Sequence, residues 1–214
     1  MREQVVVVGA SGFGRETLDT LGAMIAVGSQ ISITGVIDDL PSEANLARIE
    51  ARGVEHLGTL DDWLASGQDA KFLLAIGAPA IRRKLVDKLE AAGRHPFTAV
   101  HPTAILGART VLEAGAIVSA GAILSTNVHL GRHVHVNPGV VIGHDSVAED
   151  FVSINPAAVI SGEVHLESGV LVGAAATVLQ HLRVASSSTV GAGAVVTKNV
   201  PPNVVVKGVP GAWG

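Results

Sequence analysis

The chain contains no cysteine and no tyrosine, and aromatic residues make up only 3% of its 214 residues. Without cysteine it has no disulfide framework, no thiolate nucleophile and no thiolate metal site. We therefore expect a protein of a reducing compartment, the cytoplasm. Because large rings are scarce, the core must be built from Val, Ile, Leu and Ala, which suits thin repeated layers better than one bulky centre.

Two further classes of protein are excluded by what the sequence has little of. No apolar run approaches the ~18 residues that a membrane-spanning helix needs, and we expect no targeting segment. The 15 Lys and Arg residues are outnumbered by 19 Asp and Glu residues, which gives a formal net charge of −4. The chain therefore lacks the overall positive charge of a nucleic-acid-binding protein.

The first part of the chain, 1–98, alternates short aliphatic runs with amphipathic stretches, a pattern typical of a small parallel sheet flanked by helices. We predict a small Rossmann-like α/β domain here. Its expected elements are strands at 5–8, 31–37 and 72–76, a helix that follows the glycine turn 9–14 and ends at Gly28, a short helix at 61–64, and a helix that buries Ile81, Leu85 and Leu89 before Gly93.

The second part, 99–214, has a period of six. Every sixth residue from Val100 to Val196 is apolar. At 48% apolar residues, chance gives such a run in a chosen frame about 4 times in a million. Each unit is one short strand and a tight corner, and three successive units return the chain to the same face. The pattern predicts a prism-shaped parallel β-helix with a C-terminal tail, in which each coil buries its core against its neighbours.

Small residues mark the corners of this predicted prism. The residue after the inward aliphatic one is often glycine or asparagine, and we expect it to accept the backbone angles that a corner demands. These positions are Gly107, Gly131, Asn137, Gly143, Asn155, Gly173 and Gly191.

Blocks in both parts resemble a known family. They are VVVVGASGFG, VIDD, LLAIG, HPTAIL, GHDSVAEDF and VPPNVVVKGVPGAW, in this order. Together they are similar to left-handed β-helix (hexapeptide-repeat) acetyltransferases of bacteria, which modify nucleotide-activated 4-amino sugars in the bacillosamine and perosamine pathways, or sialic acid. The resemblance covers essentially the whole chain. It implies that the β-helix is left-handed, since the period alone does not give the hand.

The resemblance also implies an activity and a set of residues. It implies an acetyl-CoA-dependent homotrimer, with active sites between adjacent prisms and the nucleotide of the sugar held by the first domain. The general base falls on His144, its acidic neighbour on Asp145, and the backbone donor to the thioester oxygen on Gly162. An asparagine seven residues before the base is matched by Asn137. Independently, three units of the repeat separate Gly162 from His144, which places the two on the same face one coil apart.

We expect the glycine turn and the end of the second strand to hold the nucleotide. Glycines between a strand and a helix let backbone amides approach a phosphate, and a carboxylate can accept hydrogen bonds from ribose or base. The turn lacks the dinucleotide spacing G-x-G-x-x-G. Phe13 and Ser153 depart from the family, which commonly has histidine at both positions. The expected substrate-binding residues are Gly9, Ser11, Gly12, Phe13, Gly14, Asp38, Asp39, Gly77, Asn137 and Ser153, and those for acetyl-CoA are Gly173 and Gly191.

Three nearby histidines raise the question of a metal site. The period places His129 and His135 on different faces of the prism and His133 at another phase, so they do not converge. We expect solvated surface histidines and no metal. His135 lies one coil before Ser153 and is a weaker candidate to replace the histidine that the family has there.

These observations predict an acetyl-CoA:sugar N-acetyltransferase of polysaccharide biosynthesis, with direct attack of the amine on the thioester. Imidazole titrates near neutral pH and suits the general base, and its acidic neighbour can hold the ring tautomer. An O-acetyltransferase of sialic acid or a related sugar is the alternative within this class. A non-catalytic trimeric β-helix scaffold is the alternative of another class. The sugar, the nucleotide base and acyl groups other than acetyl stay open.

Overall fold

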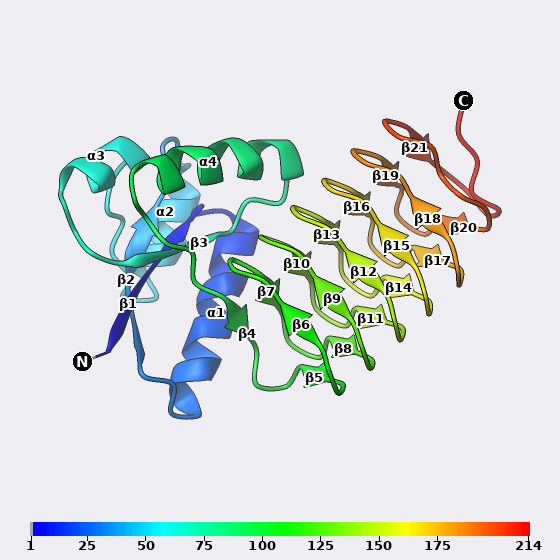
Figure 1. The fold of residues 1–214 in the computed structure, drawn as a ribbon. Helices are drawn as coiled ribbons and strands as arrows, with labels where there is room; N and C mark the ends of the chain where they lie inside the picture. Colours follow the sequence, from blue (N-terminus) through cyan, green and yellow to red (C-terminus); the bar gives the residue numbers. More distant parts are fainter. Residues whose placement is uncertain (1) are drawn as a thin grey trace.

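The computed structural model describes residues 2–214, which form two parts of different architecture (Figure 1). A small sheet with helices comes first, and a stack of short strands follows. The N-terminal part lies beside the first coils of the stack, and the C-terminus lies at its other end. No helix in these residues is long and apolar enough to cross a membrane.

The N-terminal part is built on a parallel sheet with the strand order β2-β1-β3. Its strands are β1 (Glu3–Val8), β2 (Ile31–Ile37) and β3 (Lys71–Leu74), and its helices are α1 (Gly12–Ala26), α2 (Glu43–Glu50), α3 (Leu60–Ala65) and α4 (Pro79–Ala91). Alternate residues of β1 face opposite sides of the sheet. Val5 and Val7 pack with α1, whereas Val6 and Val8 pack with α3 and α4. The predicted Rossmann-like arrangement is confirmed, and α2 is a helix that the sequence analysis did not predict.

The buried face of α4 differs from the prediction. Arg82, Val86 and Leu89 are the buried residues of this helix. Ile81 is 54% exposed, and Leu85 is only partly buried. The two residues instead border a cavity at the carboxyl edge of the sheet. A buried arginine breaks the apolar pattern, which is why the pattern selected the wrong face.

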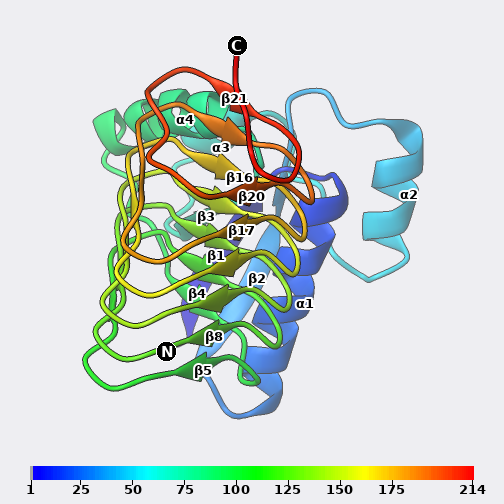
Figure 2. The same cartoon turned by 90° about the vertical axis from the view of Figure 1, so that its right-hand side faces the viewer.

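The second part is a left-handed parallel β-helix whose two-residue strands form three faces (Figures 1 and 2). The first face contains β4 (Ala99–Val100), β7 (Ile117–Val118), β10 (His135–Val136), β13 (Ser153–Ile154), β16 (Leu171–Val172), β19 (Thr189–Val190) and β21 (Val205–Val206). The second face contains β5 (Ile105–Leu106), β8 (Ile123–Leu124), β11 (Val141–Ile142), β14 (Val159–Ile160), β17 (Thr177–Val178) and β20 (Val195–Val196). The third face contains β6 (Val111–Leu112), β9 (His129–Leu130), β12 (Val147–Ala148), β15 (His165–Leu166) and β18 (Arg183–Val184).

The strand register confirms that three units of the repeat make one coil. Val136 in β10, for example, pairs with Val118 on one side and Ile154 on the other. The second residue of each strand points into the prism, and from Val118 to Val196 these residues form one buried core. Leu106 is 40% exposed because its strand pairs only with β8, at the open end of the stack.

The corners use a different residue from the one that the sequence analysis predicted. A positive φ occurs three residues after the inward aliphatic one, as at Asp145 (φ 59°) after Ile142. Gly143, directly after Ile142, does not have a positive φ. It is required because a Cβ there would lie 2.5 Å from the backbone nitrogen of Gly162 in the next coil. The close approach of neighbouring coils, and not the backbone angle, therefore accounts for this glycine.

The N-terminal part covers the first face of the β-helix, and this overturns the prediction that His133 and His135 are solvated. Both are buried. The ring of His133 stacks between Phe72 and Phe151, with centroid distances of 5.9 and 5.5 Å. Burial lowers the pKa of His133 to about 3 and the pKa of His135 well below its usual value. The six-residue period of the β-helix cannot reveal which of its outward residues the N-terminal part covers.

Candidate active site

His144 and Asp145 lie together at the corner where the chain leaves β11 for β12. The side chain of His144 is 56% exposed. Its Nδ1 lies 2.8 Å from Oδ2 of Asp145, as an N–H that donates to the carboxylate. Adjacent side chains usually diverge, but the left-handed backbone at Asp145 lets these two meet on the outside of the prism. With Nδ1 protonated, Nε2 keeps the lone pair that a base needs.

A second donor holds the carboxylate of Asp145. Nδ2 of Asn127 donates to Oδ1 at 2.7 Å, one coil before the site. The hydrogen bonds from Asn127, first, and from His144 lower the pKa of Asp145, because both stabilise the charged form. The carboxylate is therefore anionic at neutral pH and able to stabilise an imidazolium. Sequence analysis missed Asn127, although it lies three repeat units before Asp145, a spacing that could have indicated it.

Gly162 lies directly beside the imidazole of His144. A Cβ on Gly162 would be 2.6 Å from Nε2 and 2.8 Å from Cε1 of His144. The period predicted this neighbourhood. The backbone N–H of Gly162 makes no hydrogen bond to any residue within 2–214, so it is available to an oxygen near Nε2. The role of Gly162 as a donor stays a prediction.

An aliphatic stripe runs along the second face beside this corner. It consists of the outward residues Ile105, Ile123, Val141 and Val159, which are between 37% and 59% exposed. These residues belong to neighbouring coils, because β5, β8, β11 and β14 pair in this order, and Figure 2 shows how the strands of this face are stacked. His144 follows β11 and therefore lies at one edge of the stripe. Exposed aliphatic residues in a continuous row are typical of a surface that another protein covers.

A cavity of about 420 Å³ lies at the carboxyl edge of the three-stranded sheet. Gly9, Asp38 and Asp39 line it together, as the positions of these residues at strand ends predict. The rest of the lining is aliphatic: Val8, Ile37, Leu40, Leu60, Ile76, Ile81 and Leu85. The cavity therefore offers a flat apolar group a place beside two carboxylates.

The two carboxylates at this cavity differ in their contacts. Asp38 accepts from the backbone nitrogen of Ala10 at 2.7 Å and from that of Leu40 at 3.0 Å, so both of its oxygens hold the surrounding turns. Asp39 accepts from the backbone nitrogen of Leu60 at 2.7 Å through Oδ1 only. Its Oδ2 has no hydrogen bond to the part of the chain that the structure describes. Asp39 is therefore the better placed of the two to bind a ligand.

The glycine turn beside the cavity leads into α1. Gly9 has a φ of 115°, and a Cβ on Gly14 would lie 1.9 Å from the carbonyl oxygen of Gly9, so only glycine fits at both positions. The side chain of Ser11 precedes the helix without capping it. The N–H groups of Gly12 and its neighbours in the first turn thus remain for an anion.

The N-terminal part contacts the β-helix around Arg82, in a region that we call the domain junction. Two predicted substrate residues, Ser153 and Gly77, lie in it. Oγ of Ser153 accepts from both Nη atoms of Arg82 at 3.1 Å and donates to the carbonyl oxygen of Gly77 at 3.1 Å. Ser153 is buried, so its hydroxyl is not open to a substrate in this structure. Nη2 of Arg82 also donates to the carbonyl oxygen of Phe151 at 2.6 Å.

Phe13 and His135 extend the domain junction. The two rings have a centroid distance of 4.8 Å, and Nη1 of Arg82 lies 3.1 Å from Nδ1 of His135. Burial lowers the pKa of Arg82 to about 9. Both departures from the family, Phe13 and Ser153, therefore lie in this one buried cluster, and His135 holds Arg82 here and is not at the surface.

The remaining predicted residues form a column on the first face. Nδ2 of Asn137 donates to the carbonyl oxygen of Ile154 at 3.0 Å and to Oδ1 of Asn155 at 3.3 Å. Asn137 is buried, so its amide serves the stack of coils. Gly173 and Gly191 follow in the same column. A Cβ on Gly173 would lie 2.5 Å from a backbone nitrogen of the next coil, which accounts for the glycine without a cofactor.

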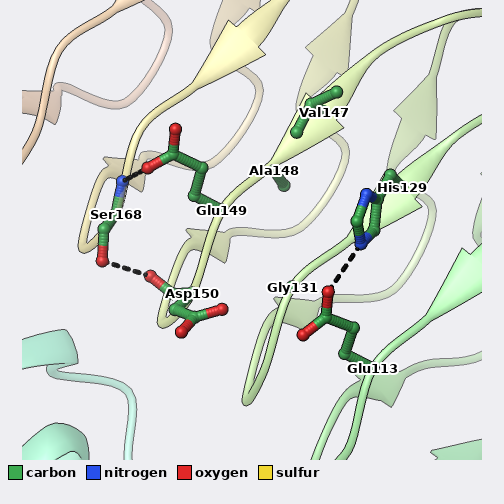
Figure 3. A pocket seen from close by; sticks show the side chains of 8 residues that line it. All are labelled: Glu113, His129, Gly131, Val147, Ala148, Glu149, Asp150 and Ser168. Atoms are coloured by element: carbon green, nitrogen blue, oxygen red, sulfur yellow. Dashed lines mark hydrogen bonds and ion pairs between the residues drawn. The ribbon is translucent and has the colours of Figure 1, made fainter.

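The third face carries paired histidines. Nε2 of His129 lies 2.8 Å from Oε1 of Glu113, and Nε2 of His165 lies 2.6 Å from Oε1 of Glu149. Figure 3 shows the hollow between these coils, with His129 turned towards Glu113. Among the described residues, no group of three or more His, Asp or Glu side chains is arranged to hold a metal ion.

The N-terminal part matches a known domain family, the PglD N-terminal domain, over residues 4–89. The sequence of the chain as a whole matches no curated protein.

Solved structures that resemble the chain extend the similarity beyond residues 4–89. The acetyltransferase domain of PglB from Neisseria gonorrhoeae is 26% identical, with a TM-score of 0.88 and 100% of both chains covered, and it has been solved with acetyl coenzyme A. Perosamine N-acetyltransferase from Caulobacter crescentus, solved with CoA and GDP-perosamine, is 25% identical, with a TM-score of 0.87 and coverage of 99% and 96%. WeeI from Acinetobacter baumannii is 25% identical, with a TM-score of 0.86 and coverage of 99% and 100%. The resemblance to bacterial sugar acetyltransferases is confirmed.

Proposed function

We propose that the chain is an acetyl-CoA-dependent N-acetyltransferase that acts on the amino group of a nucleotide-linked sugar. The observation that carries this proposal is the corner at which Nε2 of His144 faces the backbone of Gly162 while Nδ1 is held by Asp145. The similarity over 99–100% of the chain to an acetyltransferase domain solved with acetyl coenzyme A, and to a perosamine N-acetyltransferase solved with CoA and GDP-perosamine, supports it. A scaffold protein would not need this pair at its surface.

The arrangement supports direct transfer of the acetyl group. The sugar amine attacks the thioester carbonyl carbon and becomes positively charged as the C–N bond forms. Nε2 of His144 removes a proton from this nitrogen, and Asp145 stabilises the resulting imidazolium. The N–H of Gly162 donates to the carbonyl oxygen as it gains negative charge. When the C–S bond breaks, the imidazolium returns the proton to the sulfur of CoA.

The nucleotide belongs to the PglD N-terminal domain in this proposal. The amides of the glycine turn and of the first turn of α1 suit the phosphates, because a helix N-terminus carries free N–H groups and a partial positive charge. The aliphatic cavity suits the base or ribose, and the free oxygen of Asp39 suits one of their donors. We assign 1–98 to the nucleotide sugar and 99–214 to acetyl-CoA.

The aliphatic stripe supports a homotrimer. One prism leaves His144 more than half exposed, whereas acyl transfer needs a site that excludes water. A second copy packed on the second face would bury the stripe and close the site beside His144. We further propose that the enzyme acts in the cytoplasm, in polysaccharide biosynthesis.

The decisive experiment measures release of CoA from acetyl-CoA with a panel of nucleotide-linked amino sugars, the corresponding hydroxy sugars and free sialic acid. Amine-dependent release, with an N-acetyl product seen by mass spectrometry, is the expected result. Release only with a hydroxyl acceptor would identify an O-acetyltransferase. Absence of release with every acceptor, in a protein that also binds no acetyl-CoA, would support a scaffold.

A further inference from the structure

The corner between the second and third faces carries a column of outward side chains. The left-handed residues of this corner recur once in every coil, with φ values between 57° and 61°, and all of them are exposed. They are Arg109, Asn127, Asp145, Glu163 and His181. Because the coils stack in register, each residue in this column lies next to the residues one coil before and one coil after it.

Of the two residues beside Asp145 in this column, only one is hydrogen-bonded to it in the described structure. Glu163, on one side, is paired with Nδ1 of His181 at 3.3 Å. Asn127, on the other side, donates to Oδ1 of Asp145 at 2.7 Å. His144 takes the second oxygen at 2.8 Å. Each oxygen of the carboxylate therefore has its own donor, and the carboxylate plane is held at two points.

This hold matters because the pair is exposed. An exposed ion pair or hydrogen bond usually contributes little, since water competes for each partner and side-chain rotation is free. A carboxylate fixed by one bond can turn away from the imidazole, but one fixed at both oxygens cannot turn without breaking the second bond. The amide of Asn127 donates to Asp145 without bringing a positive charge of its own. The negative charge of the carboxylate therefore remains to stabilise the imidazolium.

We infer that Asn127 is a positioning residue of the acetyl-transfer site, acting through Asp145 to fix the ring orientation and tautomer of His144. The inference rests on the proposed function of His144 as the base. In this arrangement Asn127 keeps Asp145 ionised, Asp145 keeps the proton of His144 on Nδ1, and Nε2 stays free to accept the proton of the acceptor amine beside Gly162.

The test replaces Asn127 by glycine, which accepts a φ of 58° and removes only the amide side chain. We expect kcat to fall about tenfold while the KM for acetyl-CoA is unchanged, because the residue acts on the base and not on the cofactor. Nitrogen-15 NMR of the His144 ring should report a protonated Nδ1 in the wild type and a mixture of tautomers in Asn127→Gly. The pKa of Asp145 should rise towards its usual value.

A double-substitution cycle separates a positioning role from a structural one. Asn127→Gly should cost nothing further in an Asp145→Gly background, since the carboxylate that transmits its effect is gone. Asn127→Asp, which has the same shape but places a second carboxylate beside Asp145, should lower kcat more than Asn127→Gly. Asn203→Gly is the matched control, because it makes the same change at an exposed residue with a φ of 60° and should leave kcat and tautomer unchanged.

Two results would overturn the inference. One is an unchanged kcat and an unchanged His144 tautomer in a folded Asn127→Gly protein. The other is a full additional loss of kcat in the Asp145→Gly background. If the proposed role of His144 as the base is wrong, the His144→Ala protein keeps its acetyl-transfer activity. The ring spectrum of His144 in the wild type and in Asn127→Gly still reports whether Asn127 controls the tautomer.

Discussion

Gly162 lies beside His144 at a position where any side chain would collide with the imidazole ring. A Cβ there would stand 2.6 Å from Nε2, and atoms of the ring are its three nearest neighbours. Gly162→Ala should therefore displace the imidazole and lower kcat by about 10²-fold, with little loss of stability because an exposed ring can move aside. Steady-state kinetics and a thermal melt measure both effects. Gly22→Ala, where a Cβ meets nothing within 4 Å, is the control, and an equal loss in both variants would refute the steric explanation.

His144→Ala should lower kcat by roughly 10²- to 10⁴-fold and leave acetyl-CoA affinity nearly unchanged, since the ring acts on the acceptor. Asp145→Asn should be milder, because an amide still accepts a hydrogen bond but does not stabilise the imidazolium. His129→Ala, on the third face, is the control, and an undiminished kcat in His144→Ala would place the base elsewhere.

The buried His133 predicts a loss of stability in acid. Its pKa is about 3 in the folded protein against 6.5 for an unperturbed histidine, so the fold holds the neutral form. Its contribution is fully present above pH 6.5 and is lost as the pH falls towards 3, at about 1.4 kcal/mol for each pH unit. Urea unfolding at a series of pH values measures this slope. His133→Asn, which cannot be protonated, should reduce the slope and leave the part that the buried His135 contributes, whereas His129→Asn should not change it. A slope unchanged by His133→Asn would contradict the assignment.

The contacts of Asp38 and Asp39 predict different effects for the same substitution. Asp39→Asn should weaken nucleotide binding about tenfold with little change in stability, because Oδ2 of Asp39 is the oxygen left for a ligand. Asp38→Asn should lower stability, because both of its oxygens hold backbone N–H groups. Calorimetric titration with nucleoside diphosphates and thermal melts separate the two. If both variants bind the nucleotide as tightly as the wild type, the cavity is not part of the substrate site.

The aliphatic stripe predicts an assembly that a single charge can break. Ile123→Glu on the second face should prevent the proposed trimer from forming and abolish activity while the β-helix stays folded, since the residue is exposed in the single chain. Val111→Glu, at an exposed aliphatic position on the third face, should change neither the assembly nor the activity. Light scattering and circular dichroism provide the measurement. A fully active monomeric wild type would end the shared-site proposal.

The repeat made the β-helix and the neighbours within one corner predictable. Because three units make one coil, any two residues three units apart are stacked, so Gly162 could be placed beside His144 without a structure. The same rule would have found Asn127. It could not find the burial of His133 and His135, because that depends on the face against which the N-terminal part packs.

Arg82 illustrates the same limit from the other side of the domain junction. Within α4, the spacing of Ile81, Leu85 and Leu89 predicted one buried face, whereas the buried residues are Arg82, Val86 and Leu89. The acceptors that allow the arginine to be buried are the carbonyl oxygens of Phe151 and Val152 and the hydroxyl of Ser153, far along the chain in the β-helix. No local pattern contains that information.

The positive φ at the corners of the β-helix was missed for another reason, since mostly residues other than glycine adopt it here.

The stacking of the corners gives His144 neighbours at fixed intervals of 18 residues along the sequence. In an enzyme whose site is built from loops, a new contact to the base requires a loop of suitable length and shape. Here a single substitution at 126, one coil before His144, changes what flanks the ring while every backbone hydrogen bond of the prism is kept. Acceptor preference can therefore diverge among such enzymes by point substitutions along one edge, without insertions and without a change in the scaffold.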